Sequence, residues 1–301
     1  MEVPVFLGLN CPLWMICAVL NMFFIFCLFF PRSGSKEIKQ PLKILLSVIV
    51  VCAAILQIFF LQKMVMGSSA LYTTLYRIIN IILKDLVEIS MTTTMWLNVF
   101  YFSQIVPAEK GPLKWLKTNI KLFIYCALIF DWAFLLSNGL FDIVSHVKSA
   151  QNANNATANA THAVNKQAQG DSTAIGLFVC EISYLLLCLF VMMMTSVATV
   201  SYLRAHMKTV KDSDLSSSLR SQARVTITGI IQTVLYSVCN AWIISYMIKT
   251  TFFETTFDKK SHVFYTIISI YSLGTALNLA VGQSVFRVRA AELWRKVSTK
   301  K

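Results

Sequence analysis

Seven long apolar stretches, separated by polar segments, dominate the pattern of this 301-residue chain. Each is close to or longer than the roughly 20 residues that a helix needs to cross a hydrocarbon layer. Because this layer offers no water to peptide groups, such stretches must be helical. The pattern predicts an all-α fold, a single domain of seven transmembrane helices over residues 1–301. The stretches lie at Leu13–Phe30, Leu42–Leu61, Ile78–Val106, Ile120–Phe141, Thr173–Leu203, Val225–Ile248 and Val263–Phe286.

Positive charge is distributed unevenly between the segments that join these stretches. The segments after the first, third, fifth and seventh stretches contain 18 of the 27 Lys and Arg residues, whereas the segments on the opposite side contain seven. The positive-inside rule then places the N-terminus outside and the short basic tail, residues 287–301, in the cytoplasm. The net charge of +13 is therefore an orientation signal, which predicts membrane lipid as a partner and no nucleic acid.

The polar segment at residues 142–172 is expected to be a mobile second extracellular loop. Its Asn- and Ala-rich centre has too little apolar surface to form a core. It contains two Asn-X-Thr sequons, at Asn155 and Asn159, on the side that the charge pattern places outside. Two independent signals thus predict that this loop is glycosylated.

Motifs of soluble catalysis and of metal binding are missing from the sequence. It has no Gly-rich phosphate loop, no His-Glu-x-x-His and no Gly-x-Ser-x-Gly. No Cys and His residues have the spacing of zinc ligands, so neither a cofactor nor a metal is expected. Cys11 and Cys180 both lie toward the outer side, and their spacing leaves open whether they pair. The chain is not expected to be an enzyme.

Charged residues inside the apolar stretches are the most informative polar groups, because charge in hydrocarbon usually faces a bundle interior or water. Lys84 and Glu88 lie one helical turn apart, near the predicted outer rim of the third helix. Glu88 could bind a cationic ligand in a water-filled vestibule, or it could form an ion pair with Lys84 at the wet end of the helix. Glu181 presents the same two alternatives, whereas Asp131 is expected to be a packing or hydrogen-bonding group.

Aromatic residues with polar atoms occur along the sixth and seventh stretches. Such side chains suit a pocket for small amphipathic molecules, and they also anchor helices at the membrane interface. Both interpretations remain open for most of them, and the pocket is favoured for Tyr265. These residues are Tyr236, Trp242, Tyr246, Tyr265 and Tyr271.

The third stretch ends in the run Phe100–Ile105, Phe-Tyr-Phe-Ser-Gln-Ile. This run is similar to the Phe-Tyr-Phe-Leu-Lys-Ile that ends helix three of the bitter taste receptors (type 2 taste receptors), a family of G-protein-coupled receptors that the chain resembles. Shorter similarities occur at Asn21–Ile25, Trp115–Lys117, Ser201–His206 and Gly282–Ser284. The marks of rhodopsin-like receptors are missing: helix three lacks Asp-Arg-Tyr, helix six lacks Cys-Trp-x-Pro and helix seven lacks Asn-Pro-x-x-Tyr.

The resemblance implies a plasma-membrane receptor that binds a small-molecule agonist and activates a gustducin-type, inhibitory-family G protein. Several departures indicate a divergent member: Gln104 replaces a usual lysine, Leu83 and Val87 replace the usual tryptophan and asparagine, and Thr275 replaces a frequent histidine. The implied ligand positions are Asn80, Leu83, Lys84, Val87, Glu88, Tyr265 and Ile268, with Glu181, Trp242 and Tyr246 added from the residues themselves. The implied G-protein-coupling positions are Tyr101, Gln104, Leu203, His206 and Met207.

Three alternative functions remain. A type 1 vomeronasal-like pheromone receptor shares the Ser-x-x-x-x-His pattern at the end of helix five and the glycosylated outer loop. The Phe-Tyr-Phe run of helix three argues against this alternative. A transporter or channel would be expected to show an internal repeat or helices broken near the midplane, and the sequence shows neither. An intramembrane enzyme would need paired catalytic groups, and Asp131 has no evident partner in the sequence.

Overall fold

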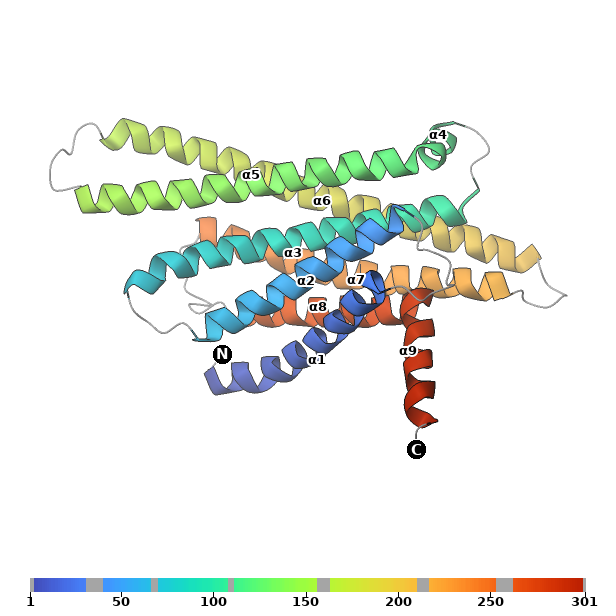
Figure 1. Ribbon diagram of the computed structural model, residues 1–301. Helices are drawn as coiled ribbons and strands as arrows, with labels where there is room; N and C mark the ends of the chain where they lie inside the picture. The colour runs from blue at the N-terminus through green and yellow to red at the C-terminus, as the bar shows by residue number, and fades with distance from the viewer. Residues whose placement is uncertain are drawn as a thin grey trace.

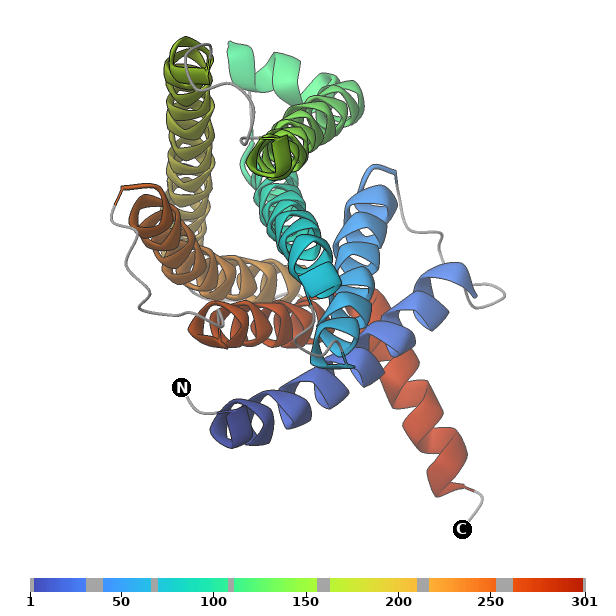
Figure 2. The ribbon, with the colours of Figure 1, turned by 90° about the vertical axis from the view of Figure 1, so that its left-hand side faces the viewer.

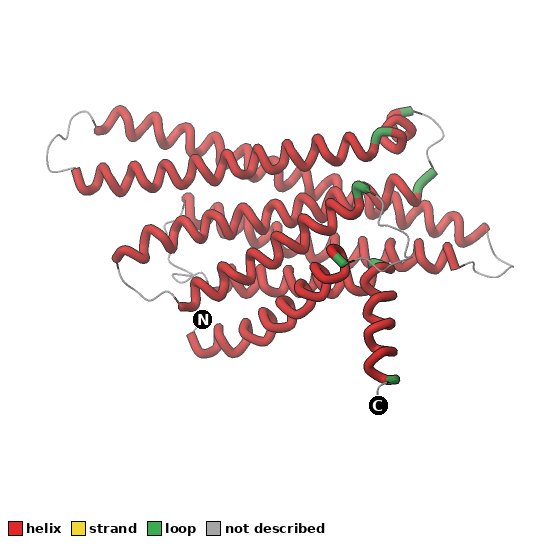
Figure 3. The backbone as a smooth tube through the Cα atoms, viewed as in Figure 1, coloured by secondary structure: helices red, strands yellow, loops and turns green. Residues whose placement is uncertain are grey.

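The computed structural model describes residues 3–30, 40–65, 70–107, 111–155, 163–209, 217–252 and 262–299. This part of the chain forms nine helices and no strand (Figures 1 and 3). The helices are α1 (Val3–Phe29), α2 (Leu42–Val65), α3 (Ala70–Ile105), α4 (Pro112–Thr118), α5 (Ile120–Asn155), α6 (Ala163–Thr209), α7 (Ser217–Phe252), α8 (His262–Gly282) and α9 (Ser284–Ser298).

Seven long helices form a bundle in which successive helices run in opposite directions, while α9 leaves the bundle at a steep angle (Figures 1 and 2). We call the end at which α1 begins the first end, and the end at which α9 begins the second end. The second end carries most of the described basic residues, in agreement with their uneven distribution along the sequence. They are Lys114, Lys117, Lys121, Arg204, Arg224, Arg287, Arg289, Arg295 and Lys296.

Six helices are long and apolar enough to cross a membrane, namely α1, α2, α5, α6, α7 and α8. Their outward faces are apolar as well. On α6, Leu186, Phe190, Met193 and Val197 recur at helical spacing and are all about half exposed or more. A continuous apolar face of this kind is unfavourable in water and favourable against lipid chains. The structure therefore shows an all-helical fold with the character of a membrane protein.

Helix α3 is more polar than these six and lies inside the bundle. It packs against α2, α5 and α6 and also contacts α7. All residues from 87 to 95 are buried, which means that this section of the helix has protein on every side. Such a helix needs no lipid-facing surface and can carry Thr92, Thr93 and Thr94. The hydroxyls of Thr93 and Thr94 each donate to a backbone carbonyl one turn earlier, so that burial leaves neither unpaired.

The interior contains two large apolar clusters, one in each half of the bundle. The cluster in the first-end half includes Trp14, Phe60 and Tyr265, and the cluster in the second-end half includes Phe24, Ile124 and Phe286. Hydrogen bonds between helices accompany this packing. The Trp14 indole donates to the Ser269 hydroxyl over 2.7 Å, which joins α1 to α8. Such bonds fix helix positions that apolar packing alone would leave adjustable.

The segment expected to be a loop at residues 142–172 is helical over much of its length. Helix α5 continues to Asn155 and α6 begins at Ala163. The two flanks contain Ala, Gln and Lys, which are good helix formers, and this explains why helix extends into a segment that cannot form a core. Asn155 is the last residue of α5, and the predicted glycosylation site Asn159 lies outside the described residues.

Candidate functional site

The charged residues of α3 meet acidic residues of α5 and α6 in the first-end half of the bundle. The Lys84 Nζ lies 2.5 Å from Glu181 Oε1 on α6 and 4.0 Å from Asp142 Oδ2 on α5. Lys84 and Glu181 are mostly buried, whereas Asp142 is about half exposed. These two ion pairs join α3 to α5 and α6. Helical spacing suggested Glu88 as the partner of Lys84, but its ion-pair partners come from other helices.

Glu88 is fully buried, which differs from the open rim that we expected for it. The expectation placed the start of this helix at Ile78, but α3 begins at Ala70, so Glu88 lies near its middle. Among the described residues no N–H group donates to either carboxyl oxygen of Glu88, and its hydrogen-bonding neighbour is another acid, Glu181. Its electrostatic neighbours are Glu181, Lys84 and Asp85. A buried carboxylate without donors is expensive, and this makes Glu88 the least satisfied group in the site.

A fourth carboxyl group, that of Asp85, lies close to the backbone of α5 because residue 139 there is glycine. A Cβ atom added at Gly139 would collide with the Asp85 carboxylate, so the two helices touch where α5 has no side chain. Asp85 is buried and has Lys84, Glu181 and Asp142 as electrostatic neighbours. One ammonium group thus stands among four carboxyl groups in this described part of the bundle: Asp85, Glu88, Asp142 and Glu181.

Aromatic residues of α7 and α8 border the other side of Glu88. Tyr236 is fully buried and Tyr271 nearly so, and Tyr271 is an electrostatic neighbour of Tyr236. Glu88 is an electrostatic neighbour of Tyr236 as well. The indole nitrogen of the half-buried Trp242 lacks a hydrogen-bond partner among the described residues. Polar groups of α3, α7 and α8 therefore lie together around Tyr236.

The remaining predicted ligand positions divide between this region and the apolar core. The Tyr265 hydroxyl donates to Asn80 Oδ1, which joins α8 to α3, and Tyr246 stacks on Phe264 with ring centroids 4.6 Å apart. Leu83, Val87 and Ile268 are buried in the apolar cluster of the same half, where they pack around the polar groups. The structure thus brings Asn80 and Tyr265 together, and Lys84 and Glu181 together.

Asp131 has the hydrogen-bonding role that we expected, and the structure supplies its partners. The Trp96 indole donates to Asp131 Oδ2 over 2.6 Å, and the Tyr184 hydroxyl donates to Oδ1. These bonds connect α5 to α3 and α6. A carboxyl group with donors on both oxygens acts as a structural connector between the three helices.

A second polar region lies in the second-end half, between α3, α7 and α8. The Gln283 side-chain amide donates to the Tyr101 hydroxyl, and a cavity of about 30 Å³ lies beside this pair. Such a volume holds one or two water molecules. Two amides organise its wall: Gln232 donates to the Thr275 hydroxyl over 3.0 Å, and Asn278 donates to Gln232 Oε1 over 2.9 Å. The complete lining is Thr94, Leu97, Asn98, Tyr101, Thr228, Gly229, Gln232, Thr275, Asn278, Leu279 and Gln283.

The other predicted coupling residues lie at the same end but do not join this network. Gln104 is exposed and Leu203 is buried. The exposed His206 ring stacks on Tyr202 with centroids 5.9 Å apart. The side chain of Met207 lies outside the described residues.

Sequence reasoning missed three residues of these sites, Asp142, Gln232 and Asn278. Asp142 was assigned to a loop, although Asn138, Gly139 and Asp142 together form a small and polar face on one turn of α5. Gln232 and Asn278 are amides inside apolar stretches, and that pattern alone signals a buried polar contact.

Neither the cysteines nor the comparisons with known proteins identify a further site or a family. Cys11 and Cys180 are both free thiols in the structure, so it does not contain the disulfide that the sequence left open. No group of metal-ligating side chains that could hold an ion occurs among the residues that the structure describes. Neither a known protein-family model nor a curated protein matches this chain.

Proposed function

We propose that the protein is a seven-helix chemosensory receptor of the plasma membrane, similar to the bitter taste receptors, that binds small molecules in its outer half and activates a G protein. One observation carries the proposal. Helix α3 bears an unsatisfied buried carboxyl group, Glu88, beside aromatic residues, and 13 residues further on it bears Tyr101 beside a polar cavity. The two positions lie about 20 Å apart along one helix.

In this proposal α3 is the seventh membrane-crossing helix, and the first end of the bundle is extracellular. The support for the orientation is the excess of Lys and Arg at the second end. The support for the crossing is the position of α3 among α2, α5 and α6, each of which is apolar enough to span. The helices that surround α3 shield its hydroxyl and carboxyl groups from lipid.

The mechanism is a shift between two conformations. An agonist that binds better to one arrangement of the outer residues favours that arrangement by its difference in affinity. Because α3 contacts helices at both ends, the same rearrangement changes the surroundings of Tyr101 at the cytoplasmic face. Tyr101, Gln104, Leu203, His206 and Met207 are the proposed G-protein-coupling positions, and the partner is a gustducin-type, inhibitory-family protein.

The transporter or channel alternative has less support. Such proteins place interrupted helices at the membrane midplane, where unpaired backbone groups bind the substrate. Within the described helices of the bundle, the prolines inside a spanning segment are Pro4 and Pro12, both in the first half of α1. The pheromone-receptor alternative predicts the same architecture, and the response to ligands separates it from the bitter-receptor proposal.

The test is expression with reporter G proteins and separate panels of bitter compounds and steroidal pheromones. A response to bitter compounds through an inhibitory-family G protein supports the proposal, whereas a response confined to pheromones supports the alternative. The matched variant Glu88→Gln keeps the shape of the side chain and removes its charge. Silence of a receptor with verified surface expression, with no ligand-independent coupling, would contradict the receptor function.

A further inference from the structure

The charges around Lys84 do not balance. Its ammonium group forms ion pairs with Glu181 and Asp142, and Glu88 is also among its electrostatic neighbours. Asp85 adds a fourth carboxyl group to the same part of the bundle. Lys84 can bond closely to only some of these groups at once. In the structure Glu181 receives the close contact with Lys84, and no N–H group among the described residues donates to Glu88, whose hydrogen-bonding neighbour is Glu181.

Glu88 needs a donor that carries positive charge. It has no exposed surface, so water does not compensate for its missing hydrogen bonds. A charged N–H donor would satisfy a carboxyl oxygen and its charge together, and such bonds are about twice as strong as neutral ones. An aromatic residue, Tyr236, is another electrostatic neighbour of Glu88, and Tyr271 is in turn a neighbour of Tyr236. A ligand with an ammonium group on an aromatic or aliphatic ring would match both the carboxyl group and these aromatic residues.

We propose that the outer site takes an organic cation, a protonated amine on an apolar ring system, and that Lys84 is an internal cation that competes with it. The inference rests on the proposed function and names the ligand class of its site. Binding places the ligand ammonium on Glu88 and moves the Lys84 side chain aside. Lys84 lies one turn from Glu88 on the same face of α3, so its displacement also vacates space beside the carboxyl group.

A metal ion fits this site poorly. No group of three His, Cys, Asp or Glu side chains among the described residues has the geometry to hold one. Tyr236, the neighbour of Glu88, belongs to the same apolar cluster as Leu83 and Met91, whose side chains offer an organic ligand apolar contact and offer a metal ion no oxygen ligand. The inference is therefore limited to organic cations.

The competition predicts an effect in an unexpected direction. Removing a positive side chain from a binding site usually weakens it, but here Lys84→Met removes a competitor and should tighten amine binding roughly tenfold or more. Lys249→Met is the matched control, because it removes a lysine from the exposed surface of α7 at the same end. Glu88→Gln should abolish the preference for charged ligands.

The experiment measures binding to the full chain in lipid nanodiscs by equilibrium dialysis. The probes are arylalkyl tertiary amines, such as N-benzylpiperidine, each paired with its neutral amide, such as N-benzoylpiperidine. The expected result is that amines bind better than amides, that Lys84→Met increases this ratio and that Lys249→Met does not. Equal binding of the two probe classes, or weaker amine binding to Lys84→Met, overturns the inference.

Two further measurements separate the proposed competition from an effect of unpaired Glu181, and ligand binding from signalling. Because Lys84→Met leaves Glu181 unpaired, the double variant Lys84→Met/Glu181→Gln repeats the test in a chain without that defect, and it too should bind amines more tightly than the wild type. G-protein activation is measured separately. Amine binding without any signalling supports the cation site and contradicts the receptor function, whereas signalling by amides and amines alike supports the receptor and overturns the cation site.

Discussion

The Tyr101 hydroxyl accepts a hydrogen bond from the side chain of Gln283, and this bond ties α3 to the residue at which α8 ends and α9 begins. Gln283 holds this joint through its backbone as well, because its N–H donates to the Leu279 carbonyl and its own carbonyl accepts from Arg287. Helix α9 leaves the bundle directly after this joint. Phe286 anchors its first turn against Phe24 of α1, with ring centroids 4.4 Å apart.

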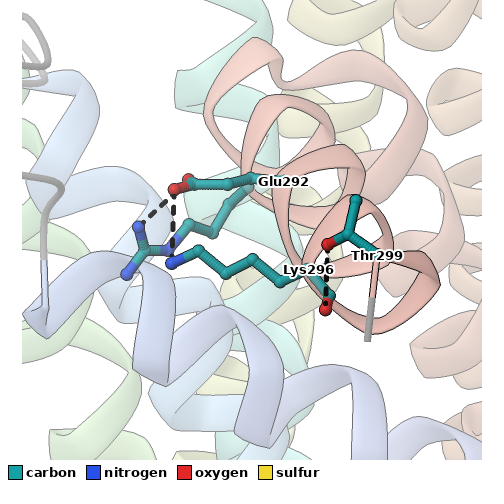
Figure 4. A network of polar contacts seen from close by, with 4 residues as sticks. Glu292, Lys296 and Thr299 are labelled. Atoms are coloured by element: carbon teal, nitrogen blue, oxygen red, sulfur yellow. Dashed lines mark hydrogen bonds and ion pairs between the residues drawn. The ribbon is translucent and has the colours of Figure 1, made fainter. Parts of the chain in front are cut away.

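A small charged network lies within α9, and one of its members, Arg289, also contacts α1. Glu292 forms ion pairs with Arg289 and Lys296, at 3.3 and 3.7 Å (Figure 4). The Arg289 guanidinium also lies 5.3 Å from the ring centroid of Phe26 on α1. Together with the Tyr101–Gln283 bond, the contacts of Phe286 and Arg289 with α1 fix the direction in which α9 leaves.

Removal of the Tyr101–Gln283 bond should raise ligand-independent signalling in the proposed receptor. A hydrogen bond of this kind contributes about 0.5–1.5 kcal/mol, so the Tyr101→Phe variant should shift the ratio of two conformations roughly two- to tenfold. Reporter G-protein activity without agonist measures the change. Gln283→Leu should act in the same direction, and the double variant should add little to either single change. Additive effects of the two substitutions would contradict a direct functional contact between them.

Disruption of the Asp131 connector should lower stability. In Asp131→Asn one carboxyl oxygen becomes an amide that faces an N–H or O–H donor, and this should destabilise the protein by about 1–3 kcal/mol. The measurement is the Tm of the purified protein in detergent. Ser137→Ala is a control on the same helix, because the exposed Ser137 hydroxyl bonds only to the carbonyl of Phe134 one turn earlier. An unchanged Tm for Asp131→Asn would mean that the three helices do not depend on this group.

The sequence predicted the all-helical fold and the approximate position of each long helix, because long apolar stretches have few ways to fold. Six of the seven expected stretches fall on helices apolar enough to span. The starts of α2, α5 and α8 agree with the expected stretches to within one residue, whereas α1, α3, α6 and α7 begin eight to ten residues earlier. Helix α3 differs because it is buried by other helices. Its Thr92, Asn98 and Glu88 reduce its hydropathy, and only the packing of α2, α5 and α6 around it explains how they are accommodated.

The candidate site was harder to predict, because depth along a helix does not determine what surrounds a side chain. The four-residue spacing of Lys84 and Glu88 suggested that they pair, yet the closest partner of Lys84 is Glu181, almost a hundred residues away. The burial of Glu88 depends on Tyr236 and its neighbours, which come from another helix. Pairings of this kind are set by tertiary packing and leave no local pattern in the sequence.

The two sequons provide a test of orientation. If the first end is extracellular, Asn155 and Asn159 face the compartment in which N-linked glycans are attached. Treatment of the protein from mammalian cells with an endoglycosidase should then increase its mobility on a gel, and the double variant Asn155→Gln/Asn159→Gln should already show the faster mobility. The single variants determine which of the two sites is used. No shift on treatment, together with labelling of the first end from the cytoplasm, would reverse the proposed orientation.

Gly139 gives a test of the close contact between α3 and α5. Gly139→Ala should destabilise the protein by about 1–3 kcal/mol, because the new methyl group collides with the Asp85 carboxylate. Gly176→Ala on α6 is the matched control: a Cβ atom there meets nothing within 4 Å, and alanine favours helix, so stability should hold or rise. Unfolding in detergent by heat or denaturant measures both. The double variant Gly139→Ala/Asp85→Ala should recover most of the loss, since it removes the colliding group, and equal losses in the single and double variants would show that the contact lies elsewhere.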